Sequence, residues 1–184
     1  MLATLRLRHL RPFVASFSSL VLVVAVLAAA LPAPGAAQGI TRLGDFGDWS
    51  AYKFKEKGNT VCYMASMPKK SEGKYTKRGD VYAIVTHRPA EKVRDEVSII
   101  AGYTYKKDSE VKVIIGDRTF RLFTDKDSAW APDAAADKAL VQAMIKGRTM
   151  VVKGTSARGT LTTDTYSLNG FTKTYRTITK ACGL

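Results

Sequence analysis

Short runs of β-branched and aromatic residues recur along the chain, with Gly, Pro, Asn or Asp between them. Runs of this length and composition are typical of β-strands, and turn residues at intervals of about ten positions are typical of all-β domains. The predicted strands span residues 60–66, 81–86, 96–103, 111–115, 118–123, 150–152 and 160–168. A further strand is indicated where Lys53, Lys55 and Lys57 alternate with Tyr52 and Phe54, which places the three lysines on one strand face. We therefore expect a mainly β fold, either an antiparallel β-sandwich or a barrel-like domain.

The clearest hairpin of the chain covers residues 111–123. Its two apolar strands are joined by Gly116-Asp117. Glycine at the first central position is the requirement of a type II′ turn, whose twist matches that of the flanking strands. The pattern therefore predicts a two-residue connection at this point.

A first short helix is predicted over residues 134–146, as a cover for the sheet. Asp133 is a suitable N-cap for it, and Gly147 a suitable terminator. Leu140 and Met144, with Val141 beside them, form an apolar stripe at helical spacing.

A second short helix is predicted after the break at Asn169-Gly170. Its apolar positions fall on one helical face, at residues Phe171, Tyr175, Ile178 and Cys182. Four threonines between residues 172 and 179 lower its helix propensity. We therefore expect this helix to depend on docking against the rest of the fold.

Three polar segments are expected to be irregular. Residues 38–45 are predicted to be a flexible lead-in, and residues 69–78 an exposed loop rich in lysine. A further loop is expected to open at residues 125–127 and to end at Trp130.

The first 37 residues have the pattern of a secretory signal peptide. Arg6, Arg8 and Arg11 precede an apolar core, and a segment of small residues ends at Ala37. An uncleaved membrane anchor is the alternative, although the apolar core is short for a membrane span. Cleavage would leave residues 38–184 as a single domain and lower the net charge from +13 to +10.

The chain has two cysteines, Cys62 and Cys182. Disulfides persist in oxidising compartments, so two cysteines in an exported chain favour a bridge between them. Two buried free thiols are the alternative. A bridge would join an early strand to the last helix.

The sequence carries little that points to catalysis. A Ser–His hydrolase would have to combine Ser156 with His87, but the residues around Ser156 miss the spacing of a nucleophile elbow by one position. Residues 125–127 begin like a calcium loop and lack its later ligands. We expect no enzyme activity, no metal site and no cofactor.

Basic residues gather in the segment 69–78 around Tyr75. The candidate anion-binding residues there are Lys69, Lys70, Lys74, Lys77 and Arg78. Outside the cytoplasm, suitable partners are anionic lipid head groups, lipopolysaccharide, glycans and acidic host or envelope proteins. The export signal disfavours nucleic acid, and a merely basic, soluble surface is the alternative reading of the charge.

Arg158 lies between small residues in a turn. One interpretation is a buried ion pair between Arg158 and Asp164 or Glu96, which would fix the register of the strands. The other is that Arg158 binds an anion directly, because a guanidinium matches phosphate and carboxylate in shape.

Several segments of the chain together resemble the invasion-associated locus B family of bacterial envelope proteins. They are FGDW (46–49), CYMAS (62–66), VTHRPAEKVRDEVSIIAGY (85–103), FRLFTDKDSAW (120–130), VQAMIKGRTMVVKGTSARGTLTTDTYSLNGF (141–171) and the terminal Ala181-Cys182. The resemblance covers nearly the whole chain after the signal peptide.

The resemblance implies an exported periplasmic or surface-associated protein whose paired cysteines correspond to Cys62 and Cys182. It carries no catalytic residue over. The basic residues favour a non-enzymatic function, the binding of an anionic envelope or host component. The alternatives are a structural or accessory role through a protein–protein interface and a hydrolase that uses Ser156 and His87.

Overall fold

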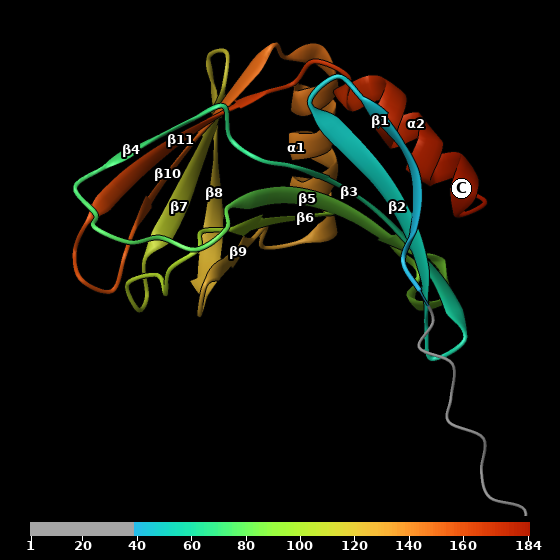
Figure 1. Cartoon of the computed structure of the whole chain (residues 1–184), viewed down its shortest axis with the longest axis horizontal. Coiled ribbons are helices and arrows are strands. Elements are labelled where there is room, and N and C mark those ends of the chain that lie inside the picture. The colour runs from blue at the N-terminus through green and yellow to red at the C-terminus, as the bar shows by residue number, and fades with distance from the viewer. Residues whose placement is uncertain (1–38) are drawn as a thin grey trace, which may run out of the picture. The chain divides into compact units, whose positions relative to one another are not determined.

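The computed structural model describes residues 39–184, which form an antiparallel sheet of eleven strands covered by two α-helices (Figure 1). The strand order is β1-β2-β3-β5-β6-β9-β8-β7-β10-β11-β4. Because β1 and β4 are free edges, the sheet is not closed. The predicted mainly β, antiparallel fold with two covering helices is confirmed. The predicted signal peptide, residues 1–37, lies outside the described residues.

The strands are β1 (Thr41–Phe46), β2 (Trp49–Glu56), β3 (Asn59–Ser66), β4 (Lys70–Gly73), β5 (Tyr82–Arg88), β6 (Val93–Ile100), β7 (Glu110–Ile115), β8 (Arg118–Asp125), β9 (Ser128–Trp130), β10 (Thr149–Thr155) and β11 (Leu161–Ser167). The helices are α1 (Ala134–Lys146) and α2 (Phe171–Ala181), with a 3-10 turn at Pro89–Glu91. Neither α-helix of residues 39–184 is long and apolar enough to cross a membrane.

The sheet bends so strongly that β2 and β11 meet, although they lie near opposite ends of the strand order. The Trp49 indole donates to the carbonyl of Ser167 over 2.9 Å, and the Asp48 amide donates to the carbonyl of Asn169 over 3.0 Å. Trp49 is almost fully buried and packs edge-on against Phe171. The bend therefore encloses one continuous apolar core.

Helix α1 forms over the residues that the sequence predicts. The Asp133 side chain caps it by accepting from the Ala136 amide over 2.8 Å. Gly147 ends it in an extended conformation rather than a left-handed one. Glycine is needed there for space, because a Cβ atom would lie 2.6 Å from Ile115 and 2.8 Å from Leu168. The helix packs mainly on β6.

Helix α2 buries the predicted apolar face, with Phe171, Tyr175 and Ile178 against β1, β2 and β3. Three of its threonine hydroxyls bond back to carbonyls one turn earlier, as Thr174 does to Gly170 and Thr179 to Tyr175, both over 2.8 Å. Such bonds satisfy the hydroxyls but do not strengthen a helix. The stability of α2 therefore comes from its contacts.

The predicted hairpin is present as β7 and β8, with Ile115 opposite Arg118. Gly116 takes a φ of 60°, in the left-handed region that the turn requires. Three strands were not predicted. The expected lead-in forms β1 with a bulge at Gly44, the expected loop contains β4, and the loop before Trp130 contains β9. These strands are short or lie at an edge, so their sequences lack a buried apolar face.

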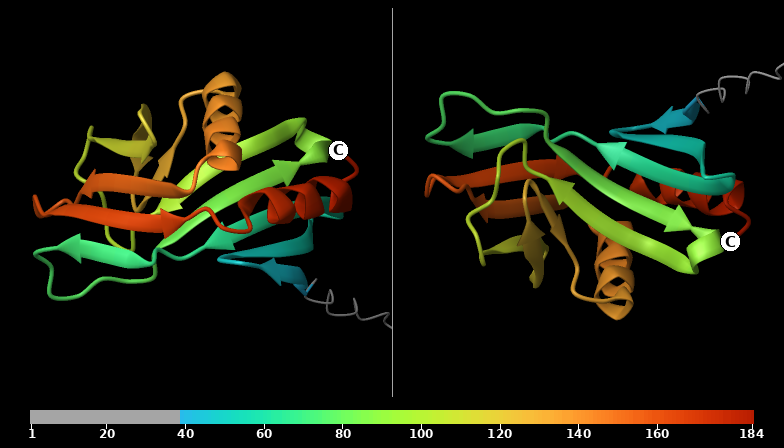
Figure 2. Two further views of the ribbon diagram at one scale, coloured as in Figure 1. Left: turned by 90° about the horizontal axis from the view of Figure 1, so that it is seen from above. Right: turned by 90° about the horizontal axis from the view of Figure 1, so that it is seen from below.

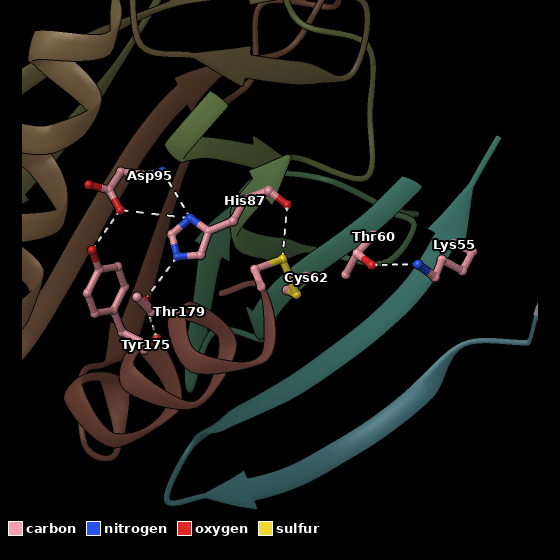
Figure 3. Close-up of a disulfide and its surroundings, with 8 residues drawn as sticks. Lys55, Thr60, Cys62, His87, Asp95, Tyr175 and Thr179 are labelled. Atoms are coloured by element: carbon pink, nitrogen blue, oxygen red, sulfur yellow. Dashed lines mark hydrogen bonds and ion pairs between the residues drawn. A yellow bond between two sulfur atoms is a disulfide. The ribbon is translucent and has the colours of Figure 1, made fainter. Parts of the chain in front are cut away.

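A disulfide joins Cys62 of β3 to Cys182, the residue that follows α2 (Figure 3). Their Cα atoms lie 5.9 Å apart, within the usual range for a bridge. The two cysteines are 120 residues apart in the chain. The bridge thus fastens the end of a helix with weak propensity to the sheet beneath it.

His87 lies fully buried beside this disulfide (Figure 3). Its Nδ1 atom accepts from the Asp95 amide over 3.1 Å, and its Nε2 atom lies 3.2 Å from the Thr179 hydroxyl, which itself donates to the Tyr175 carbonyl. These bonds fit a neutral imidazole with its proton on Nε2. Burial lowers the pKa of His87, outweighing the opposing effect of the nearby Asp95 carboxylate.

Removing the disulfide should destabilise the fold strongly. The Cys62→Ala/Cys182→Ala variant should lose about 4–5 kcal/mol of unfolding free energy, because the bridge closes a long loop in the unfolded chain. Urea unfolding followed by circular dichroism measures the loss, and added reductant should affect only the wild type. Equal unfolding midpoints for wild type and variant under oxidising conditions would contradict the structural role of the bridge.

Stability should also decline in mild acid because of His87. Its folded pKa lies below the ordinary value of 6.5, so protons bind the unfolded state preferentially as the pH falls below about 6.5. The stability advantage of wild type over His87→Gln should therefore shrink between pH 6.5 and the folded pKa, and stay constant above pH 7.

Asp137→Asn is the control of opposite sign for this measurement. Burial raises the pKa of Asp137 to about 6, so its contribution to stability is lost as the pH rises through that value. Thermal unfolding across the pH range separates the two residues. Parallel pH profiles for wild type and His87→Gln would show that the buried imidazole is not the acid-sensitive group.

Candidate functional site

Three of the six predicted anion-binding residues are already paired with carboxylates. Lys69 lies 2.9 Å from Asp48, and Lys70 lies 2.8 Å from Glu72 of the same strand. The Arg78 guanidinium lies 2.6 Å from Asp164. These three pairs neutralise cations of the segment, so fewer of its positive charges are available to an anion in solution.

The other three candidates, Lys74, Lys77 and Arg158, are exposed and line one pocket of about 470 Å³. No carboxylate of residues 39–184 lies within ion-pair distance of any of them. None of the residues that line the pocket is acidic. We call this hollow the basic pocket; its other lining residues are Tyr75, Thr76, Tyr103, Thr104, Ser156, Ala157, Thr160 and Thr162.

The walls of the basic pocket come from three separate connections of the sheet: the loop after β4, the segment after β6 and the turn between β10 and β11. Figure 2 shows β4, β10 and β11 at one end of the sheet and α2 at the other. Backbone bonds join the walls, from the Ala157 amide to Thr104 and from the Gly79 amide to Gly102, both over 2.8 Å. The pocket is therefore framed by main chain and not only by mobile side chains.

Arg78 joins the loop after β4 to β11 and to the segment after β6. It donates to both oxygens of Asp164, over 2.7 and 2.6 Å, and through Nε to the Ala101 carbonyl over 2.6 Å. Its guanidinium also lies over the rings of Tyr75 and Tyr103, at 5.5 and 4.9 Å from their centroids. The side chains of Arg78 and Asp164 are only 5% and 3% exposed.

This arrangement bears on two residues that the sequence analysis singles out. Arg78, one of the predicted anion-binding residues, donates through all three guanidinium nitrogens to acceptors inside the protein. Asp164 was one of two carboxylates proposed as partners of Arg158, and it pairs with Arg78 instead, while Arg158 stays exposed at the rim. The expected buried arginine–carboxylate pair exists, but a different arginine forms it.

Tyr103, which lines the pocket, is uncharged at neutral pH. Burial raises the pKa of Tyr103, and its hydroxyl lies 2.6 Å from that of Thr162. The pocket surface thus combines three basic side chains with neutral hydroxyl groups.

Two other hollows of the described residues that contain several cations also contain carboxylates. One of about 620 Å³ contains Arg42 and Lys69 together with Asp45 and Asp48. Another, beside α2, contains Lys92, Arg94 and Lys138 together with Asp95. The basic pocket differs because its positive charges have no carboxylate among them.

The structure does not assemble the hydrolase pair. His87 is buried under α2 with its ring nitrogens bonded to Asp95 and Thr179. The Ser156 hydroxyl accepts from the Thr160 amide over 3.1 Å, within the turn between β10 and β11. Residues 39–184 contain no cluster of three His, Cys, Asp or Glu side chains suited to a metal ion.

Sequence reasoning missed Tyr103, Thr104 and Thr160 as pocket residues. Tyr103 is the last residue of a predicted strand and Thr104 follows it, and nothing local indicates that they face a turn fifty residues later. One signal for Asp164 was present: the alternation in 160–168 places it on the opposite face from Leu161 and Thr163. That face is the buried one.

Comparison with known proteins identifies the family. The model of the family described as "Invasion associated locus B (IalB) protein" matches residues 49–179. The crystal structure of invasion associated protein b from Bartonella henselae superposes with a TM-score of 0.52 and 15% sequence identity, over 75% of this chain and 95% of that chain. This second likeness shows a shared fold.

No curated protein sequence is significantly similar to the chain. The family match nevertheless extends over more than half of its length and includes β2 to β11 and most of α2. The protein therefore belongs to the invasion-associated locus B family.

Proposed function

We propose that the protein is an exported, non-enzymatic component of the bacterial cell envelope that binds an anionic envelope or host component at the basic pocket. The observation that carries the proposal is the convergence of Lys74, Lys77 and Arg158, the three unpaired candidates, on one hollow without a carboxylate. The signal-peptide pattern of residues 1–37 and the disulfide both favour a location outside the cytoplasm, in the periplasm or at the outer surface.

The electrostatics of the pocket support an anionic ligand. Like charges gathered without counter-charges repel one another, and an anion that binds among them relieves the repulsion. The chain without its first 37 residues has a net charge of +10, which attracts anions over a longer range. Both effects are screened by salt.

Reversing the pocket charges should weaken binding to anionic surfaces. The Lys74→Glu/Lys77→Glu variant should bind lipopolysaccharide and phosphatidylglycerol vesicles roughly 30-fold less tightly than wild type, at about 1 kcal/mol for each lysine lost. Sedimentation with vesicles and capture on immobilised lipopolysaccharide measure the change. Wild-type binding should fall steeply as salt is added.

Lys69→Glu/Lys70→Glu is the matched control, because it changes the net charge equally but affects lysines that are already paired. Its binding should fall much less than that of the pocket variant. Equal losses in the two double variants would show that general charge, and not the pocket, determines binding.

An accessory role through a protein–protein interface is the second candidate. A hollow of about 340 Å³ on the open face of the sheet is lined largely by apolar and aromatic side chains, among them Phe54, Tyr63, Ile84 and Trp130. The test is capture of an envelope protein by wild type and variants. Capture that is unaffected by salt and by Lys74→Glu/Lys77→Glu, but is lost in Phe54→Ser, would favour this candidate over anion binding.

A further inference from the structure

The lining of the basic pocket is more varied than a site for a simple anion requires. Beside its three cations it presents the side chains of Thr76, Thr104 and Thr160 and the ring of Tyr75, which is 37% exposed. Threonine hydroxyls both donate and accept hydrogen bonds, which suits alcohol groups. A partly exposed aromatic ring offers an apolar surface within an otherwise polar hollow.

The volume of the pocket also exceeds what a lone phosphate or carboxylate needs. At about 470 Å³ it falls within the range of roughly 300–1,000 Å³ that is typical of sites for small organic ligands. An apolar ligand of that size would strip water from three charges without replacing its hydrogen bonds, which is unfavourable. The lining therefore suits a ligand that has an anionic group, several hydroxyls and one apolar face.

The positions of the cations and the aromatic ring favour one compact ligand. Lys74 and Lys77 flank Tyr75 in the chain, and Arg158 approaches from the turn between β10 and β11. Lysine binds phosphate as a point charge, whereas arginine offers a planar fork of donors. Tyr75 also contacts a buried cation, because the Arg78 guanidinium lies over its ring at 5.5 Å from the ring centre.

We propose that the basic pocket binds a phosphorylated saccharide. Lys74, Lys77 and Arg158 hold the phosphate, the threonines bond to the sugar hydroxyls, and the C–H face of the sugar ring packs on Tyr75. This inference rests on the proposed anion-binding function and narrows it to one chemical class. Such a group occurs as a free sugar phosphate and as the head group of a phosphorylated glycolipid.

Titration of the isotope-labelled protein by NMR, at constant ionic strength, tests the class of ligand. Glucose 6-phosphate should bind at least about tenfold more tightly than inorganic phosphate or glucose, and should shift the amide signals of residues 74–77 and 156–160. In Tyr75→Ala the affinities for glucose 6-phosphate and phosphate should become nearly equal. Tyr75→Phe, which keeps the ring, should retain the preference.

Intact and dephosphorylated lipopolysaccharide distinguish the two sources of the ligand. Competition of glucose 6-phosphate by intact but not by dephosphorylated lipopolysaccharide identifies a glycolipid head group. No competition by either, with glucose 6-phosphate still preferred over phosphate, identifies a free sugar phosphate.

Two results would overturn the inference. Equal affinities of wild type for phosphate and glucose 6-phosphate would show an anion site that does not recognise sugar, while leaving the proposed function intact. Failure of glucose 6-phosphate and of lipopolysaccharide to bind, with phosphatidylglycerol vesicles still bound through Lys74 and Lys77, would exclude the saccharide class. Failure of every anionic probe would overturn the proposed function as well.

Discussion

The buried ion pair between Arg78 and Asp164 is the interaction on which the pocket end of the molecule depends. It joins the loop after β4 to the core face of β11, with both side chains almost fully removed from water. Removing water from two charges is costly, and this cost is offset only when their hydrogen bonds are satisfied. Here Asp164 receives two bonds from Arg78, which also donates to the Ala101 carbonyl. Loss of either partner would leave the other charge buried alone.

The same pair distinguishes the arginine that stabilises the fold from the cations that are exposed to a ligand. Arg78 neutralises Asp164, and the charged residues that line the pocket itself are Lys74, Lys77 and Arg158. Arg78 also makes cation–π contacts with Tyr75 and Tyr103. The other end of the sheet is fastened differently, by the bridge from Cys62 to Cys182. Each end of the sheet therefore has its own interaction that holds a neighbouring segment against it, the ion pair at one end and the disulfide at the other.

Patterns within a single element predicted much of the fold. Helix α1 with its Asp133 cap, the hairpin at Gly116 and the buried face of α2 all follow from local spacing. Strands β1, β4 and β9 do not, because they are held by pairing with neighbours rather than by apolar faces of their own.

The site was predictable only in part, for a related reason. Lys74, Lys77 and Arg158 were identified as single residues, but their convergence depends on how the bent sheet brings three connections together. The choice between Arg78 and Arg158 as partner of Asp164 has the same origin: both lie near glycine in polar segments, and only tertiary structure decides which one reaches the core.

Backbone hydrogen exchange in Asp164→Asn tests this account most directly. The variant keeps the shape of the side chain but leaves Arg78 without its counter-charge, at a cost of about 3–5 kcal/mol. The amides of Gly79 and Ala157, which bond across the pocket walls, should exchange at least about a hundredfold faster than in wild type, whereas the amide of Gly147 at the end of α1 should keep its rate. Unchanged exchange at Gly79 and Ala157 would contradict the claim that the buried pair holds the pocket together.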